Sequence, residues 1–283
     1  MRGQIMRPSV GRIGIWAHSS NLSPDLARAV ESMGYGAIWI GGSPAGDLRI
    51  VDDLLAATDT LVVATGIVNI WTADATTVAT SHHRITAAFP GRFLLGVGVG
   101  HPEAVGDYQH PYRSLVQYLD VLDDEGVPQD ERALAALGPK VLTLSRERSA
   151  GAHPYLTTPE HTRQARATLG ENALLAPEQK VVIETDPQKG RDLGRRVVAK
   201  PYLELTNYVA NLRRLGWSDD DFAEGGSDAL IDALVGHGDA PTAAARVQQH
   251  LDAGADHVAI QLVTAKGTDP VDGYRRLAKA LLD

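Results

Sequence analysis

Residues 61–100 read LVVATGIVNIWTADATTVATSHHRITAAFPGRFLLGVGVG. Residues 61–70 are apolar and rich in β-branched side chains with little alternation, which is typical of a strand buried on both faces. Asp74 is a suitable N-cap for the helix that follows, and Pro90 with its neighbouring glycine ends that helix. Residues 93–99 then predict a second buried strand. The stretch therefore predicts a βαβ unit, with two glycine-containing strand ends on the same side of a parallel sheet.

The composition favours one large α/β domain over residues 1–283. With 283 residues and 43% hydrophobic content, the chain can bury a large core. The formal net charge of −8 argues against nucleic acid or an anionic membrane as the main partner. The absence of cysteine excludes disulfides, thiolate nucleophiles and Cys-ligated metals. Neither a long apolar run nor a signal core occurs, so we expect a cytoplasmic protein that acts on a small molecule.

Strand and helix patterns alternate along the chain. A series of eight strand candidates, each followed by a helix, predicts a (β/α)8 TIM barrel. The alternative is a doubly wound open sheet, whose usual sign is GxGxxG after the first strand. Here the first strand ends in WAHSSN, and the GVGVGH motif of residues 96–101 follows the fourth strand without that spacing. We therefore expect a barrel, with the acidic, glycine-rich residues 215–240 as an irregular excursion before the last strand.

Two segments resemble a known family. Residues 81–101, SHHRITAAFPGRFLLGVGVGH, resemble the core motif of the bacterial luciferase-like monooxygenases. Residues 135–162, AALGPKVLTLSRERSAGAHPYLTTPEHT, resemble the phosphate-site helix and following strand of the actinobacterial, coenzyme F420-dependent branch of that family. The resemblance implies an oxidoreductase barrel that binds a flavin or deazaflavin at the carboxyl ends of its strands, usually as a dimer.

The resemblance also implies a bulge in the third strand that contacts the cofactor. In that family a non-prolyl cis peptide lies there behind the isoalloxazine-type ring, and in this chain it would fall at Gly66–Ile67. Val68 and Asn69 would lie beside it, and the Asn69 amide offers a donor and an acceptor to a ring edge. Without the resemblance, Gly66 is explained as an ordinary strand glycine.

The tripeptide Leu137-Gly138-Pro139 predicts an anion site. The free backbone N–H groups of a helix N-terminus bind anions, and a glycine lets the anion approach closely. The resemblance assigns this site to the cofactor phosphate. The alternative is an ordinary strand-to-helix turn, with Pro139 in the first helical position.

Further cofactor contacts are expected at other strand ends. Gly98 and Gly100 could admit the ribityl chain of the cofactor close to the backbone, with His101 at the mouth of the strand. Trp39 and Trp16 are candidate walls of the pocket. Packing glycines and tryptophans that fill the barrel are the structural alternatives.

The candidate catalytic residues are His18, His153 and Tyr155. The two histidines lie near predicted strand ends, where they could transfer a proton or bind the deazaflavin and substrate. Tyr155, on the same strand end as His153, could donate to an oxygen of substrate or cofactor. Structural histidines are an almost equal alternative. A metal site built from His18, His101 and His153 has no HxH or HExxH spacing to support it, so we expect no metal.

These features predict a coenzyme F420-dependent oxidoreductase that transfers a hydride between the deazaflavin and a small organic substrate. One departure is that many F420-dependent relatives end the second strand with an Asp-His pair, where this chain has Gly42 and Ser43. The first alternative is an FMN-dependent luciferase-like monooxygenase. The second is a non-catalytic protein that binds a deazaflavin or only dimerises. A homodimer through residues 76–88 is the expected assembly.

Overall fold

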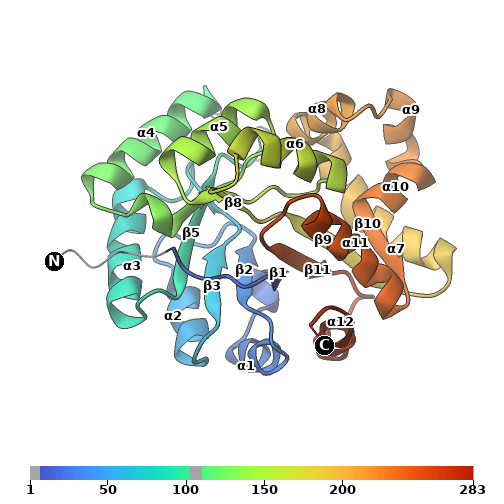
Figure 1. Cartoon of the computed structure of the whole chain (residues 1–283), viewed down its shortest axis with the longest axis horizontal. Coiled ribbons are helices and arrows are strands. Elements are labelled where there is room, and N and C mark those ends of the chain that lie inside the picture. The colour runs from blue at the N-terminus through green and yellow to red at the C-terminus, as the bar shows by residue number, and fades with distance from the viewer. Residues whose placement is uncertain (1–6, 102–109, 283) are drawn as a thin grey trace.

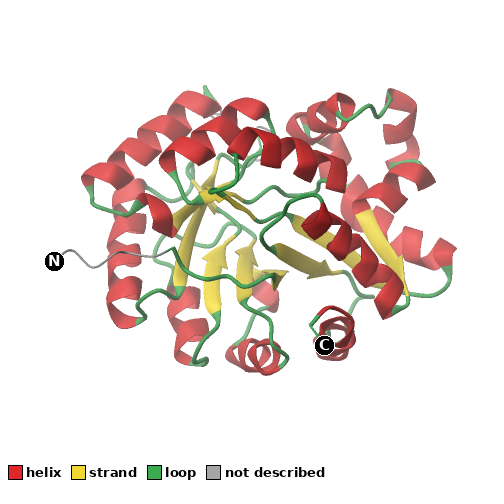
Figure 2. Ribbon diagram, in the orientation of Figure 1, coloured by secondary structure: helices red, strands yellow, loops and turns green. Residues whose placement is uncertain are grey.

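The structure is a computed structural model, and it describes residues 7–101 and 110–282. Strands form an inner parallel sheet and helices cover its outer side (Figures 1 and 2). The described strands are β1 (Ile13–His18), β2 (Ala37–Gly41), β3 (Val62–Thr65), β4 (Val68–Asn69), β5 (Phe93–Gly98), β6 (Arg132–Leu134), β7 (Gly151–Ala152), β8 (Leu174–Leu175), β9 (Glu178–Ile183), β10 (Val235–Gly238) and β11 (Val258–Leu262).

The described α-helices are α1 (Pro24–Ser32), α2 (Arg49–Ala56), α3 (Ala75–Ala88), α4 (Pro111–Asp124), α5 (Pro139–Arg148), α6 (Pro159–Leu169), α7 (Pro187–Ala199), α8 (Thr206–Arg214), α9 (Asp219–Phe222), α10 (Asp228–Leu234), α11 (Ala240–Asp252) and α12 (Val271–Leu281). Short 3-10 helices are η1 (Ser19–Asn21), η3 (Gln129–Glu131), η4 (Tyr202–Glu204) and η5 (Ala223–Gly225). None of the helices within these ranges is long and apolar enough to cross a membrane.

The sheet is curled and parallel throughout the described ladders. Its order is β10-β9-β11-β1-β2-β3-β5-β6-β7-β8, with β4 beside β5. The segment 174–183 joins the two sides of the curl. On one side, Ala176 N–H donates to the carbonyl of Ala152 in β7. On the other side, the N–H of Ala259 in β11 donates to the Pro177 carbonyl. The predicted α/β class with a parallel sheet is confirmed. β3 and β4 are two parts of one interrupted strand, and so are β8 and β9. β10 is a further strand beyond the eight that the sequence predicts.

Trp39 is a large side chain in the interior of the curled sheet. Trp39 is fully buried, and its indole N–H donates to His257 Nε2 over 3.0 Å. The His257 Nδ1–H donates in turn to the Gly11 carbonyl over 2.9 Å. The same interior cluster contains small residues, namely Ala37, Ala64, Ala133, Ala176 and Ala259, together with Leu94 and Leu174. Trp39 therefore fills the barrel interior, which was the alternative to a place on the pocket wall.

The segment 215–240, expected to be irregular, holds α9, α10 and β10 (Figure 1). Its Ser and Asp residues cap helices. Ser218 and Asp221 form a capping box at α9, and the Ser227 side chain accepts from Leu230 N–H at the start of α10. The composition that suggested a solvated loop is thus partly that of helix N-termini.

The strand pass formed by β3 and β4 contains the expected bulge. Ala64 pairs with Leu94 and Val68 with Val97, so three residues of this pass oppose two of β5, and the Gly66–Ile67 peptide is cis. The Thr65 hydroxyl bridges the interrupted ladder. It donates to the Gly96 carbonyl over 2.7 Å and accepts from Gly96 N–H over 2.8 Å. The predicted position of the cis peptide is confirmed.

We predict that T65V lowers the free energy of unfolding by about 2–3 kcal/mol, because it leaves the buried Gly96 amide and carbonyl without this partner. T65S retains the hydroxyl and should lose much less. Urea unfolding of the three proteins measures the difference. Equal losses of unfolding free energy in T65V and T65S would contradict the bridging role of the hydroxyl.

Candidate functional site

A cavity of about 450 Å³ opens at the carboxyl ends of the strands. Side chains from strand ends form most of its wall, and η4 and α8 close one side. Most of the predicted site residues lie on this wall, namely His18, Gly66, Ile67, Asn69, Gly100, His101, Leu137, Gly138, His153 and Tyr155. Trp16 and Ser43 also line it.

The remaining predicted residues lie outside the wall. Trp39 is in the barrel interior beneath His153, and Val68 is fully buried. Gly98 is a packing position, because a Cβ there would lie 2.7 Å from Ala135 Cβ. Pro139 is exposed in the first turn of α5.

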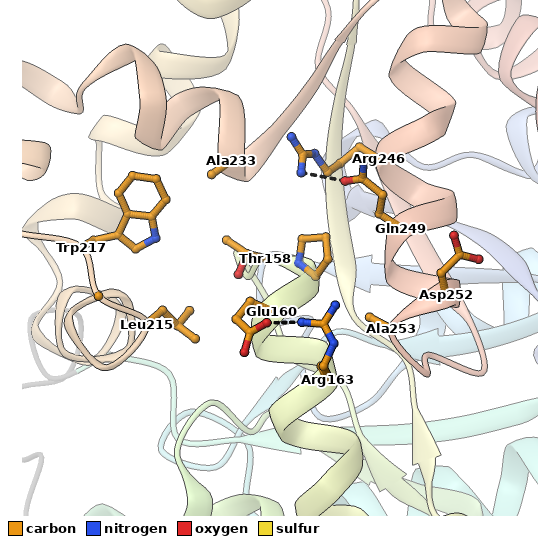
Figure 3. Close-up of a pocket in the computed structure, with 12 residues that line it drawn as sticks. Thr158, Glu160, Arg163, Leu215, Trp217, Ala233, Arg246, Gln249, Asp252 and Ala253 are labelled. Carbon is orange, nitrogen blue, oxygen red and sulfur yellow. Dashed lines mark hydrogen bonds and ion pairs between the residues drawn. The ribbon is translucent and has the colours of Figure 1, made fainter.

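A second cavity, of about 630 Å³, lies outside the barrel between α6, α11 and the loop after α8 (Figure 3). Trp217 faces α11 across it, and two pairs of polar side chains on its wall contact each other (Figure 3). Arg246 donates to Gln249 over 2.8 Å, and Arg163 pairs with Glu160. No strand end reaches this cavity among the described residues that line it. We therefore place the candidate site at the strand ends.

His153 presents one unpaired acceptor to the strand-end cavity. Its Nδ1–H donates to the Ala176 carbonyl over 2.7 Å, which fixes the tautomer with a bare Nε2. Its ring stacks on Trp39 with centroids 4.0 Å apart and planes 10° apart. The side chain is 1% exposed and Nε2 has no hydrogen-bond partner. Burial lowers the pKa of His153 to about 3, so the ring is neutral and its Nε2 can accept from a ligand.

His18 has the opposite hydrogen-bonding polarity. Its Nδ1 accepts from Ser20 N–H over 3.2 Å, which leaves the proton of the neutral ring on Nε2. The ring lies over Gly42, where a Cβ would come within 2.4 Å of His18 Nε2. The cavity thus contains an imidazole donor at His18 and an imidazole acceptor at His153.

The cavity has a cationic end at the start of α5. Gly138 is the N-cap of α5 and lines the cavity, and no side chain caps the N-terminus of the helix there. Arg214, at the end of α8, also lines the cavity; its Nη2 would lie 3.7 Å from a Cβ placed on Gly138. Its guanidinium donates to the neutral Asn211 amide over 3.0 Å. His161 donates to the Leu137 carbonyl over 2.9 Å and holds this turn in place.

Tyrosine rings form an aromatic wall of the cavity, made by Tyr155, Tyr202 and Tyr208. The ring centroids of Tyr155 and Tyr202 are 5.2 Å apart, and those of Tyr202 and Tyr208 are 5.1 Å apart. The Tyr202 hydroxyl donates to the Tyr155 hydroxyl over 3.0 Å, and Tyr155 donates to Gln261 Oε1 over 2.8 Å. Burial raises the pKa of all three tyrosines, so they stay neutral. Because the Tyr155 proton is used by Gln261, this hydroxyl offers a ligand an acceptor and not the expected donor.

Asn69 and Gly100 lie together at the edge of the bulge. The Asn69 Oδ1 accepts from Trp71 N–H over 3.0 Å, and its Nδ2 would lie 2.7 Å from a Cβ on Gly100. Gly100 also has a φ of +59°, a conformation that favours glycine. Both residues therefore shape the wall beside the bulge.

Part of the chain matches a known family in sequence. Residues 22–124 match the model of the luciferase-like monooxygenase family. No protein with a curated description matches the chain significantly in sequence.

Solved structures establish the fold across nearly the whole chain. An F420-dependent secondary alcohol dehydrogenase, in complex with an F420–acetone adduct, superposes with a TM-score of 0.75 at 14% identity, covering 96% of this chain and 98% of that one. The coenzyme F420-dependent tetrahydromethanopterin reductase of Methanopyrus kandleri gives 0.70 at 16% identity, with 96% and 98% coverage. The FMN complex of the oxygenating constituent of 3,6-diketocamphane monooxygenase from Pseudomonas putida gives 0.64 at 13% identity, with 95% and 96% coverage. These likenesses show that the chain has the fold of these enzymes.

Sequence reasoning did not find the groups that η4, α8 and β9 contribute to the site. Tyr202, Tyr208 and Arg214 belong to helices that carry no recognisable motif. The sequence could have indicated Glu178 and Lys180, since two charges two residues apart in an otherwise buried strand must share one face.

Among residues 7–101 and 110–282, no group of three or more acidic or histidine side chains is arranged to hold a metal ion.

We predict that the protein loses stability as the pH falls below about 6.5. Burial lowers the pKa of His153 and His250 to about 3 and that of His257 to about 4. Each ring binds a proton in the unfolded chain at a pH where the folded chain does not, so acid favours unfolding. Each contributes a slope that approaches roughly 1.4 kcal/mol per pH unit.

Urea unfolding at pH values from 7.5 to 5 measures this slope. NMR of the histidine rings over the same range should show no protonation of His153. A flat stability profile, or a His153 ring that titrates near its ordinary pKa, would contradict the buried neutral state.

Proposed function

We propose that this chain is a luciferase-like, coenzyme F420-dependent oxidoreductase that transfers a hydride between the deazaflavin and a small organic substrate. The observation that carries the proposal is the polarity of the strand-end cavity. One end has the α5 N-terminus at Gly138 together with Arg214, which suits a phosphate. The other end has the imidazoles of His18 and His153, which suit a reacting centre and its hydrogen-bonding groups.

The residues present fit a flat ring with an anionic side chain. The unpaired His153 Nε2 needs an N–H or O–H donor, which a deazaflavin or an alcohol can supply. At the bulge, a Cβ on Gly66 would lie 3.0 Å from both His153 Nε2 and Trp16 Nε1, so only glycine leaves the wall open there. At the other end, Gly138 brings no side chain to the N-terminus of α5, where a phosphate would bind beside Arg214.

The chain's own residues would orient the reactants and exclude water. A bound deazaflavin would supply hydride transfer at its ring. The His18 Nε2–H is placed to donate to a substrate oxygen, and His153 Nε2 is placed to accept from a substrate hydroxyl or a cofactor N–H. Trp16, whose indole N–H donates to the Gly66 carbonyl over 3.1 Å, and the aromatic wall enclose the reacting centre.

A small alcohol or ketone is the substrate class that we favour. Gly42 and Ser43 on the wall bring no charge beside His18. The likeness to a dehydrogenase solved with an F420–acetone adduct supports this choice. We also propose the cytoplasm as the site of action and a homodimer as the assembly.

We predict that the purified protein binds coenzyme F420 and that G138D weakens this binding at least tenfold. An aspartate caps the helix well, so the fold is retained, but its charge opposes the phosphate. G138N has nearly the same shape without the charge and should weaken binding much less. Fluorescence titration of the wild type and both variants with F420 measures the dissociation constants.

A parallel titration with FMN distinguishes the cofactors. Tight binding of FMN with F420 silent would replace the proposal with a flavin monooxygenase, a second candidate that the FMN-bound structural neighbour favours. Binding of neither cofactor would contradict both. Equal weakening of F420 binding in G138D and G138N would place the phosphate away from Gly138.

A further inference from the structure

We propose that the buried pair formed by Glu178 and Lys180 is a positioning device for the aromatic wall of the cavity. The inference rests on the proposed function, because that wall faces the ligand. Both side chains are 0% exposed, and Lys180 Nζ lies 3.1 Å from Glu178 Oε1. Neither residue lines the cavity, so both act through their neighbours.

Lys180 holds the rings of the wall from behind. Its Nζ lies 3.9 Å from the ring centroid of Tyr155 and 5.2 Å from that of Tyr202. An ammonium that is removed from water is attracted to the face of an aromatic ring. Since the two tyrosines are also joined by their hydroxyl groups, one cation fixes both rings.

Glu178 holds the backbone that carries these groups. Its Oε2 accepts from Leu156 N–H over 3.1 Å, and its own N–H donates to the Pro154 carbonyl over 2.8 Å. Leu156 has a φ of +52°, in the left-handed region that a leucine rarely adopts. The turn fixed in this way follows His153 directly and contains Tyr155.

The pair is not needed to fill the barrel. Neighbouring interior positions hold apolar side chains, and burying two charges in place of such residues does not generally stabilise a protein. Register places Lys180 opposite Gln261, the acceptor of the Tyr155 hydroxyl, so the strand pair β9–β11 supplies both supports of Tyr155. This concentration of polar contacts on one ring points to positioning.

The consequence for the ligand is a rigid, neutral aromatic surface on one side of the cavity. The hydroxyl protons of Tyr155 and Tyr202 are used within the wall and by Gln261, and both rings are held by the cation. We therefore expect the group that contacts this wall to be apolar or aromatic, bound by ring contacts and not by proton donation from Tyr155.

The test compares K180M with the double variant E178Q/K180M. K180M leaves Glu178 charged without its partner, so it should lower the urea unfolding midpoint. The double variant has no unpaired charge, and the amide oxygen of the new glutamine can still accept from Leu156 N–H, so the midpoint should recover. If Lys180 positions the rings, the double variant still binds F420 roughly tenfold more weakly than the wild type, a difference of about 1.4 kcal/mol.

A structural role alone gives a different result. If the pair serves only to balance its own charges, the double variant recovers both the midpoint and the wild-type dissociation constant, which would overturn the proposal. The matched control is K200M/E204Q, the same change in an exposed pair whose side chains are 81% and 62% exposed. It should change neither the midpoint nor the binding.

A second readout does not depend on the cofactor. Fluorotyrosine labelling reports each ring by 19F NMR, with the Tyr155 and Tyr202 signals assigned from Tyr→Phe variants. We expect single sharp signals in the wild type and broadened or doubled ones in E178Q/K180M. Sharp single signals in the double variant would overturn the proposal. If the wild type binds neither F420 nor FMN, this readout still decides the role of the pair.

Discussion

The closure of the curled sheet by residues 174–183 is the constraint on which the site depends. This segment pairs with β7 on one side and with β11 on the other. It also supplies the Ala176 carbonyl that fixes the tautomer of His153, and it carries Glu178 and Lys180. A shift of this segment along its neighbours would therefore move the acceptor, the turn and the aromatic wall together.

The barrel interior orients polar groups without charging them. His257 Nε2 accepts a hydrogen bond from the Trp39 indole N–H, Trp39 stacks on His153, and His153 has an unpaired Nε2 at the cavity. The hydrogen bonds of Trp39, His257 and His153 fix the orientation of each ring, because each bonded ring nitrogen has a single partner. Burial keeps the imidazoles of His153 and His257 neutral, so the acceptor that His153 presents to the cavity stays available over the physiological pH range. Such a preorganised surface favours hydride transfer, which needs fixed reactants and little solvent.

Much of the fold follows from local sequence. Asp74 caps α3 as predicted, and the alternation of strands and helices gives the parallel sheet. The resemblance placed the bulge at Gly66–Ile67, although the residue that completes it, Thr65, was not identified. A hydroxyl that replaces ladder bonds has no sequence signature, because it depends on the register between two strands.

The depth of a side chain in the barrel also has no sequence signature. Trp16 and Trp39 are neighbours in register, yet one lines the cavity and the other lies beneath it.

The contributions of η4 and α8 show a second limit of sequence analysis. Arg214 reaches the cavity only because the chain turns back after α7 and brings α8 against the strand ends. The path of a connection is set by packing between distant segments, and no local pattern encodes it.

The most direct measurement is a crystal structure of the protein with coenzyme F420. We expect the ring against Gly66–Ile67, a hydrogen bond from a ligand donor to His153 Nε2, and the phosphate between the α5 N-terminus and Arg214. A cofactor bound in the outer cavity beside Trp217, or one whose phosphate lies away from Gly138, would contradict the proposed site.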